Sequence, residues 1–339
     1  MKRRTGKDLW EMYYYLMPKC IYELANTNTM KRLMGISMHC GCNYTKFPIQ
    51  KSKFFYSRFD HSVGTALIVW RFTNDLKQSV AALFHDIATP TFAHVIDFVN
   101  KDYTTQESTE EYTVDFIKGS DEILEILKKY GLKVDDVCDY HRYPIADNDS
   151  PKLSADRLEY TLNGAYTYGL MDLTTAARII DDLVVSTNES GDPEISFKSL
   201  SVASEFFNIS LQCSKIYVAD ETRLAMDYLA ELVNLALASN AIIMDDLYKT
   251  EAIVISKFLQ NENTAKCWKD FTKFKKLGKG KTGFLTNVPA KKRYIMPLCN
   301  GTRIAENVSE IKSARNEFIK TDFNKDLCIK CNNFLAEQL

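Results

Sequence analysis

Glycine and proline are scarce in this 339-residue sequence, which contains 13 and 8 of them. Their scarcity argues against glycine-rich phosphate loops and many tight hairpins, and it favours a helical protein. No apolar run reaches the roughly 18 residues that a membrane-spanning helix needs, so no membrane segment is expected. The 43 Lys and Arg residues do not outnumber the 44 Asp and Glu residues, which excludes a broad electrostatic surface for nucleic acid.

Signals for secretion and for disulfide bonding are also lacking. The first eight residues are basic but lead into a mixed segment with Glu11, without the apolar core of a secretory signal. The nine cysteines are an odd number spread over a long chain, so we interpret them as reduced thiols of a cytoplasmic protein. A four-thiolate zinc site from Cys40, Cys42, Cys328 and Cys331 is disfavoured, because the first spacing is too short for the common zinc knuckle.

Most of the chain shows apolar periodicity of the helical type. The expected fold class is mainly α with one small β-hairpin, whose strands at 184–186 and 195–197 flank a turn at 188–193. Ser154 is expected to cap one of the helices. The expected helices cover residues 9–34, 61–72, 78–87, 92–98, 108–118, 122–130, 154–168, 173–183, 223–238 and 246–259.

Histidines and carboxylates suggest a metal site. His85 and Asp86 end an apolar helix, and a buried carboxylate there needs a partner. A divalent cation would satisfy it, because imidazoles and carboxylates are the donors preferred by Mn, Fe, Zn or Ni. His61 at a helix start and Asp156 in a first helical turn could complete the set. Taken singly, each residue also fits an ordinary satisfied core position.

The order of these residues and their flanking segments resembles the HD-domain metal-dependent phosphohydrolases, especially the deoxynucleoside triphosphate triphosphohydrolase branch. The resemblance implies that His61, His85, Asp86 and Asp156 hold one divalent transition metal ion (Mn, Fe, Ni, Zn or Co, with Mg also possible). It further implies a helical bundle in which metal-activated water attacks phosphorus. The segments that carry the resemblance are residues 56–64, 82–87, 92–97 and 154–160.

The same resemblance predicts a domain organisation. Residues 20–183 would form the HD-domain metal-binding core, and residues 184–300 a helical C-terminal lobe packed on that core. The small hairpin lies at the boundary between them. Residues 301–339 would form a polar C-terminal segment.

Further site residues follow from the motif positions. His94 and Asp97 are three residues apart, so the carboxylate can orient the imidazole and raise its pKa. The resemblance implies that His94 is the general acid, with Asp97 as its orienting partner. It also implies that Arg58 contacts a substrate phosphate and that Tyr160 packs on a sugar. Tyr217 is a second such candidate, although core packing explains both tyrosines equally well.

The sequence departs from the triphosphohydrolase pattern at several positions. Thr89 and Gln106 stand where histidines are usual, and Gly164 replaces an acidic residue near the sugar. We retain Thr89 and Gln106 as substrate-binding candidates and Glu107 as a candidate catalytic base. Losing two imidazoles argues for a single metal, and a monophosphate or another small phosphate ester fits as well as a triphosphate.

Two functional hypotheses follow. The preferred one is a phosphohydrolase that acts on a nucleotide or related small phosphate ester, forms homo-oligomers and does not associate with membranes. The alternative is a catalytically weak nucleotide-sensing or nucleic-acid-associated regulatory protein. Nucleic acid would then bind the lysine-rich residues 269–281, which include Phe271 and Phe274. His39 and His141 could enter the pocket, although a surface loop is the favoured location for His141.

Overall fold

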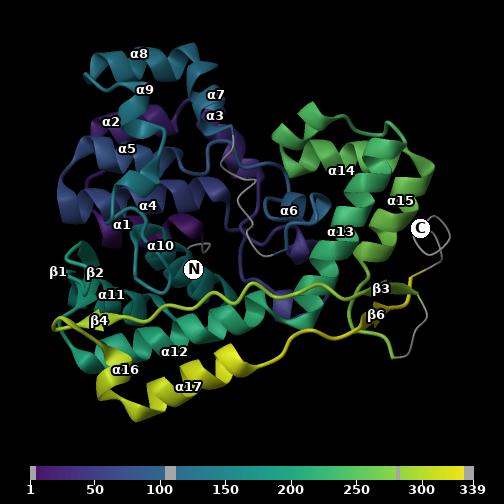
Figure 1. Cartoon of the computed structure of the whole chain (residues 1–339). Coiled ribbons are helices and arrows are strands. Elements are labelled where there is room, and N and C mark those ends of the chain that lie inside the picture. The colour runs from purple at the N-terminus through teal and green to yellow at the C-terminus, as the bar shows by residue number, and fades with distance from the viewer. Residues whose placement is uncertain (1–4, 104–111, 280–282, 332–339) are drawn as a thin grey trace.

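The computed structural model describes residues 5–103, 112–279 and 283–331. Helices dominate this part of the chain, which confirms the mainly α fold class (Figure 1). The predicted site residues Gln106 and Glu107 lie outside the described residues. Within the described helices, none combines the length and apolar character needed to cross a bilayer.

Three helices form the frame on which the predicted motif residues lie. The helix α4 (Arg58–Thr73) packs against both α5 (Leu76–Phe84) and α10 (Ala155–Tyr168). Ser57 caps α4 by accepting a hydrogen bond from the backbone N–H of Asp60. Ser154 caps α10 in the same way, as predicted from the sequence. These caps fix the first turns of the two helices, where His61 and Asp156 lie.

The N-terminal region, expected as one helical stretch over residues 9–34, is divided into short helices, so that expectation was wrong. Pro18 stands before α2, and the extended backbone that it imposes interrupts any preceding helix. Thr27 then caps α3 by accepting a hydrogen bond from the N–H of Met30. The short helices between residues 6 and 35 are η1 (Gly6–Leu9), α1 (Trp10–Tyr13), α2 (Lys19–Ala25), α3 (Asn28–Lys31) and η2 (Arg32–Gly35). Two more, η3 (Cys42–Tyr44) and η4 (Pro48–Gln50), follow before α4.

Most of the other expected helices are present, with shifted ends. The helix expected at 92–98 begins only at Val95, because Phe92 and Ala93 adopt positive φ angles of 63° and 48°. The remaining helices are α6 (Val95–Val99), α7 (Thr113–Lys118), α8 (Asp121–Lys129), α9 (Val134–Val137), η5 (Tyr140–Arg142), α11 (Leu173–Asp182), α13 (Asp220–Ala238), η6 (Met244–Tyr248), α14 (Glu251–Gln260) and α15 (Glu262–Phe271).

One long helix, α12 (Leu200–Tyr217), was not predicted. Serine is a weak helix former because its hydroxyl competes for backbone hydrogen bonds. In α12 the hydroxyls of Ser204, Ser210 and Ser214 instead donate to carbonyl oxygens of the preceding turn. Burial of one face, including Phe206 and Phe207, stabilises the helix against this low propensity.

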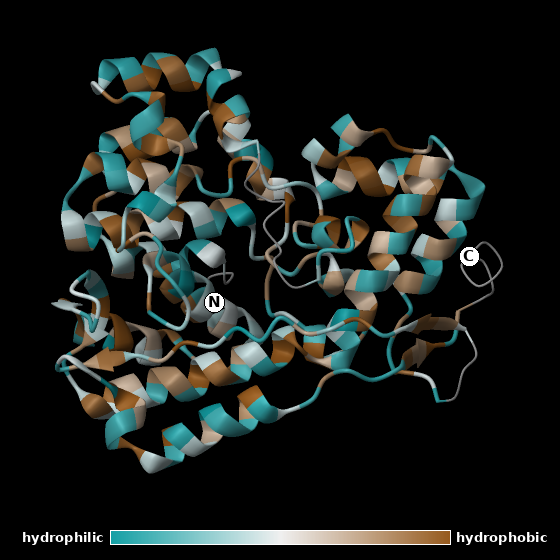
Figure 2. Cartoon of the chain, viewed as in Figure 1, coloured by the Kyte–Doolittle hydropathy of each residue, from teal (hydrophilic) through white to brown (hydrophobic). Residues whose placement is uncertain are grey.

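The hydrophobic interior consists of two clusters (Figure 2). The first lies among the N-terminal helices, α4, α5, α10 and α12. The second is built around α13, α14 and α15, and it includes the aromatic residues Phe92, Tyr228 and Trp268. Each cluster draws residues from both sides of position 183. Phe92 and Ala93, in the loop before α6, belong to the second cluster, whereas the buried residues of α4 and α5 belong to the first.

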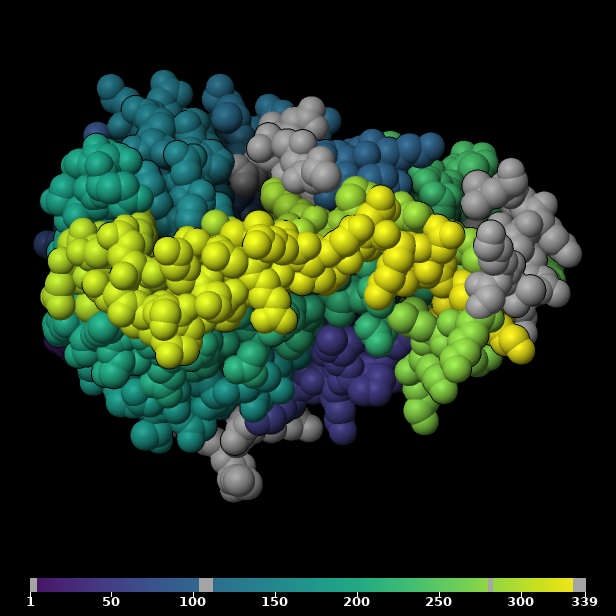
Figure 3. Space-filling view, turned by 60° about the horizontal axis from the view of Figure 1, so that its bottom comes forward, coloured from purple at the N-terminus to yellow at the C-terminus, as the bar shows by residue number. Residues whose placement is uncertain are grey.

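The strands form two small sheets. In the first, order β1-β2-β4-β5, the predicted hairpin is confirmed as β1 (Leu183–Thr187) and β2 (Pro193–Phe197), with β4 (Leu298–Cys299) parallel to β2. The C-terminal residues cross one face of the molecule as a continuous belt (Figure 3). The other elements of this region are β3 (Phe284–Thr286) paired with β6 (Leu327–Ile329), β5 (Thr302–Arg303), α16 (Ile304–Asn307) and α17 (Ser309–Lys320).

A buried carboxylate connects α14 to the loop before α4. Glu251 is 1% exposed and accepts hydrogen bonds from the backbone N–H of Ser37 (2.9 Å) and the hydroxyl of Tyr44 (2.8 Å). Burial outweighs these bonds and raises the pKa of Glu251 from 4.5 to about 7. The folded state therefore holds a proton that the unfolded chain releases, and the associated stability is lost as the pH rises from 4.5 to about 7.

We predict that Glu251→Gln removes this dependence on pH. Because one pKa unit corresponds to about 1.4 kcal/mol, the free energy of unfolding of the variant should gain about 3 kcal/mol on that of the wild type between pH 4.5 and 7. Urea unfolding at pH 5 and pH 8 measures the difference. Glu306→Gln, at an exposed position of α16, is the control and should show no such gain. A constant difference between Glu251→Gln and wild type would contradict the prediction.

Candidate metal centre and substrate cavity

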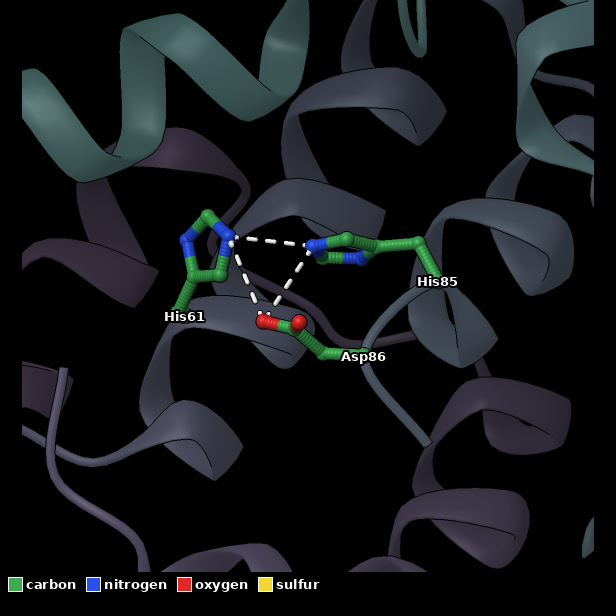
Figure 4. Close-up of side chains that lie close together, drawn as sticks. All are labelled: His61, His85 and Asp86. Carbon is green, nitrogen blue, oxygen red and sulfur yellow. Dashed lines mark hydrogen bonds and ion pairs between the residues drawn. The ribbon is translucent and has the colours of Figure 1, made fainter. Parts of the chain in front are cut away.

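Three of the four predicted metal ligands converge at one buried point (Figure 4). The Nε2 atoms of His61 and His85 lie 3.1 Å apart. Asp86 Oδ2 lies 3.4 Å from His85 Nε2 and 3.8 Å from His61 Nε2. His61 comes from the first turn of α4, while His85 and Asp86 follow the last turn of α5. The packing of α4 on α5 therefore brings together residues that are 24 positions apart.

The fourth predicted ligand, Asp156, approaches from α10. Its Oδ1 atom lies 2.9 Å from His61 Nε2 and 3.7 Å from His85 Nε2. Its side chain is 20% exposed, whereas the other three are nearly covered. The group of four residues is therefore accessible to solvent on the side where Asp156 lies.

Each imidazole is held through its other ring nitrogen. His61 Nδ1 donates to Glu159 Oε2 (2.6 Å), and His85 Nδ1 donates to the carbonyl oxygen of Ala82 (2.7 Å). Such contacts orient a ligating histidine and leave the lone pair of Nε2 directed at the metal position. Two facing Nε2 atoms and two carboxylates match the donors of a divalent transition metal. The residues present therefore fit the predicted cofactor.

The charges in this group are strongly coupled. Burial opposes a charge on His61, but the hydrogen bonds with Asp156 and Glu159 raise its pKa to about 10. A divalent cation among the same carboxylates would compete with that proton. Burial also opposes ionisation of Asp86, yet the guanidinium of Arg58 and the two imidazoles hold the pKa of Asp86 well below its usual range. Asp86 is therefore ionised and available as a ligand.

Sequence reasoning missed Glu159, which lies one helical turn after Asp156. It is fully buried and also accepts hydrogen bonds from the hydroxyl of Tyr56 and from Asn163 Nδ2. Gly64 makes this arrangement possible, because a Cβ atom there would lie 2.6 Å from Glu159 Oε1. An acidic residue three positions after a ligand on the same helix was the available signal.

We predict that Glu159→Gln weakens metal binding about 10- to 100-fold, as loss of such supporting contacts typically does. The amide keeps the size of the side chain but removes the negative charge that the Nδ1–H of His61 faces. Titration of the metal-stripped protein with Mn²⁺ or Co²⁺ measures the effect. Glu194→Gln is the matched control, because Glu194 of β2 is also a buried carboxylate and pairs with Arg303 of β5. Equal Kd values for Glu159→Gln and wild type would contradict the supporting role.

The metal group opens into a cavity of about 460 Å³ between the two hydrophobic clusters. All five histidines of the sequence line this cavity. A volume of this size is within the range of small-molecule sites. His141 lines the cavity rim with a half-exposed side chain and pairs with Asp147 (2.8 Å), whereas His39 is buried near Tyr168.

His94 and Asp97 form the predicted pair. His94 Nδ1 lies 2.8 Å from Asp97 Oδ2, and Asp97 has no exposed surface, so this is not a helix-surface pair. The two positive φ angles at Phe92 and Ala93 direct the chain into this position, and Thr91 anchors the turn by donating to the carbonyl of Lys249 (2.7 Å). Burial lowers the pKa of His94, and Asp97 raises it only in part. Asp97 thus acts on the pKa of His94 in the predicted direction, but burial outweighs its effect.

Two predicted substrate contacts are occupied by Asp86. Arg58 Nη1 donates to both carboxylate oxygens of Asp86, at 3.0 and 2.8 Å. Thr89 is fully buried, and its hydroxyl donates to Asp86 Oδ1 (2.6 Å). Both residues hold a metal ligand in place, and their contact with substrate stays a prediction. Arg58 also lines the cavity, and its Nε has no partner among the described residues.

The tyrosines predicted for the sugar both line the cavity. The rings of Tyr160 and Tyr217 lie edge to face with centroids 6.3 Å apart. A Cβ atom at Gly164 would already lie 3.1 Å from the Tyr217 hydroxyl. A larger side chain at this position would therefore crowd the Tyr217 hydroxyl, which would have to shift by a few tenths of an ångström. The glycine thus leaves room for Tyr217 in the wall of the cavity.

The cysteines and the lysine-rich stretch, the other candidate binding residues of the sequence, do not form part of the metal centre. Among the described residues, His61, His85 and Asp86 are the one group with metal-binding geometry, and the nine cysteines are free. Phe271 and Phe274 of the lysine-rich stretch are buried beside Tyr228, so their rings are not available for contact with nucleic acid bases. Part of the lysine-rich stretch 269–281, at 280–281, lies outside the described residues.

Comparisons with known proteins identify a matching domain, similar sequences and a shared fold. Residues 58–183 match the family model of the HD domain. The uncharacterized protein YdhJ of Bacillus subtilis is 26% identical over 245 residues, which span 71% of each chain. The metal-dependent phosphohydrolase cns2 of Cordyceps militaris is 29% identical over 48% of this chain and 45% of its own length. A hypothetical protein from Aquifex aeolicus shares the fold, with a TM-score of 0.60 at 18% identity over 87% of this chain and 89% of its own.

Proposed function

This chain carries an HD domain at residues 58–183, and from its site we propose that it is a metal-dependent phosphohydrolase acting on a nucleotide or related small phosphate ester. The observation that carries the proposal is the convergence of two imidazole Nε2 atoms with Asp86 and Asp156 at the wall of a cavity. The described relative that is named a metal-dependent phosphohydrolase supports the same chemistry.

His61, His85, Asp86 and Asp156 would hold the metal, since their free donor atoms face one another. When bound, a divalent cation polarises a phosphoryl oxygen and lowers the pKa of a bound water. Glu159 and the carbonyl of Ala82 accept hydrogen bonds from the Nδ1 atoms of His61 and His85, so the Nε2 atoms are the ones that face the metal position.

The HD-domain residues also supply a proton donor. His94 lines the same cavity and is oriented by Asp97. A phosphate group in the cavity favours the protonated imidazole, because it adds negative charge beside a ring whose pKa burial has lowered. His94 then donates the proton to the leaving oxygen, while Tyr160 and Tyr217 offer aromatic faces to a ring of the substrate.

The test is product analysis with protein that has been stripped of metal and reloaded with Mn, Fe, Co, Ni, Zn or Mg. Nucleoside mono-, di- and triphosphates and sugar phosphates are the substrates, and orthophosphate, pyrophosphate and tripolyphosphate are measured. We expect metal-dependent release of one of these products. Tripolyphosphate would indicate a triphosphohydrolase, and orthophosphate from a monophosphate would indicate a nucleotidase. No release while metal remains bound would contradict the proposal and favour a nucleotide sensor. Self-association stays a separate prediction.

A further inference from the structure

Six cationic side chains line the cavity, and five of them have partners within the protein. Arg58 is paired with Asp86, and Lys291 also has an interaction partner. The other three paired cations are Arg157 with Asp147, Arg223 with Asp220, and Lys292 with the carbonyl oxygen of Ile319.

Arg293 is the sixth cation. No hydrogen bond, ion pair or aromatic contact of its guanidinium is present among the described residues, although it lines the cavity and is only partly exposed. A guanidinium carries five N–H donors in a planar fork that matches the oxygens of a phosphate. Arg293 is thus the cavity cation that is free to bind an anionic ligand.

The backbone around Arg293 is held on both sides. We call residues 288–296 the strap, because this extended segment leads from the α13 side of the molecule to β4 and its residues 289–294 line the cavity (Figure 1). At one end, Arg223 Nη1 donates to the carbonyl of Val288 (2.7 Å). At the other end, the N–H of Met296 donates to the carbonyl of Pro151 (2.8 Å), in the loop before α10. The strap therefore fixes Arg293 relative to both α13 and α10.

The positive charge of Arg293 affects the pKa of two cavity residues that the proposed mechanism uses, His94 and Tyr160. Burial lowers the pKa of His94, and the positive charge of Arg293 lowers it further against the effect of Asp97. Burial raises the pKa of Tyr160 to about 12, and Arg293 is among the charges that oppose this increase. Arg293, His94 and Tyr160 all line the same cavity, and the charge of Arg293 acts on both of the other residues.

We propose that Arg293 forms a phosphate-binding subsite, supplied by the strap from outside the HD domain, for the phosphoryl group of the ligand. The proposal rests on the proposed function for the identity of the ligand as a phosphate ester. Arg293 holds the phosphoryl oxygens beside His94, while Arg58 remains paired with Asp86. Arg58 is bonded through Nη1 to the buried Asp86, so its charge is largely neutralised there, whereas Arg293 has no carboxylate partner among the described residues.

The experiment measures binding of inorganic phosphate by isothermal titration calorimetry, with both Mn²⁺-loaded and metal-stripped protein. Because a hydrogen bond to a charged group is typically worth a factor of ten or more in affinity, Arg293→Gln should raise the Kd for phosphate at least about tenfold. Arg293→Lys keeps the charge but not the planar fork, so it should recover part of the affinity. Circular dichroism and thermal unfolding show that each variant is folded.

The matched control is Lys292→Gln. It removes the same charge from the neighbouring residue of the strap, whose ammonium group lies over the ring of Phe323. We expect less than a threefold change in the Kd for this variant. Wild-type affinity in Arg293→Gln, equal weakening in both variants, or no phosphate binding by the wild type would each overturn the subsite. A failure of the phosphohydrolase proposal would look different. In that case phosphate would still bind through Arg293, but no substrate of the panel would be hydrolysed.

Discussion

Replacing Asp86 with asparagine is expected to remove both the bound metal and the activity. The substitution takes a charged donor from the group of His61, His85 and Asp156 and keeps nearly the same shape. Because metal chemistry supplies the nucleophile and polarises phosphorus, the expected loss of phosphate release is about 1,000-fold or more. Elemental analysis after dialysis measures the metal, and product release with added Mn²⁺ measures the activity.

Stability has to be followed in the same experiment. Asp86 is the carboxylate partner of the buried Arg58, and breaking a buried ion pair typically costs about 3–5 kcal/mol. Asparagine keeps one oxygen that can accept a hydrogen bond from Arg58, so we expect a smaller cost. Should Asp86→Asn unfold, His85→Gln tests the same ligand group without unpairing Arg58. Asp147→Asn is the matched control, since Asp147 lines the same cavity outside the ligand group, and it should retain metal.

The second large effect is expected at His94. His94→Asn should lower kcat by about 10²- to 10⁴-fold, the usual contribution of a general acid, while the metal content stays unchanged. The amide of asparagine can still donate to Asp97, so the buried carboxylate keeps a partner. Steady-state kinetics with the best substrate of the panel measures the change, and elemental analysis confirms the metal.

The leaving group separates proton donation from other roles of His94. A p-nitrophenyl phosphate leaves as a stable anion and needs little protonation, so His94→Asn should lose much less activity on this ester than on an alkyl or nucleoside ester. Equal losses on both esters would contradict the general-acid role and point to substrate positioning. Loss of metal from His94→Asn would contradict the separation between the proton donor and the ligand group.

Local sequence was sufficient to predict the helical frame of the site. Ser154 was a predicted capping residue, and the apolar run before His85 indicates a buried helix, so the positions of His85, Asp86 and Asp156 at helix ends followed from short-range patterns. The order of these residues was enough to indicate the HD-domain resemblance. Their common location is confirmed for His61, His85 and Asp86 by the packing of α4 on α5.

The sequence pattern was less informative where tertiary contacts override propensity. The serine-rich α12 is stabilised by its buried face, and the stretch over 9–34 is broken at Pro18 and Thr27 despite its apolar spacing. The pKa of His94 illustrates the same limit. The carboxylate neighbour is visible in the sequence, whereas the burial that dominates the shift depends on the second hydrophobic cluster.

The sequence by itself thus indicated the fold class and the pairing of His94 with Asp97, because each depends on residues within a few turns of one another. It indicated the ligand types through the order of the motifs along the chain. Only the tertiary structure decided which groups form hydrogen bonds and ion pairs with those residues. Glu159 reaches His61 because Gly64 lets α10 approach α4. Arg58 is committed to Asp86, and the free guanidinium of Arg293 comes from a strap more than 100 residues beyond the HD domain, since long-range packing sets which charges are neutralised.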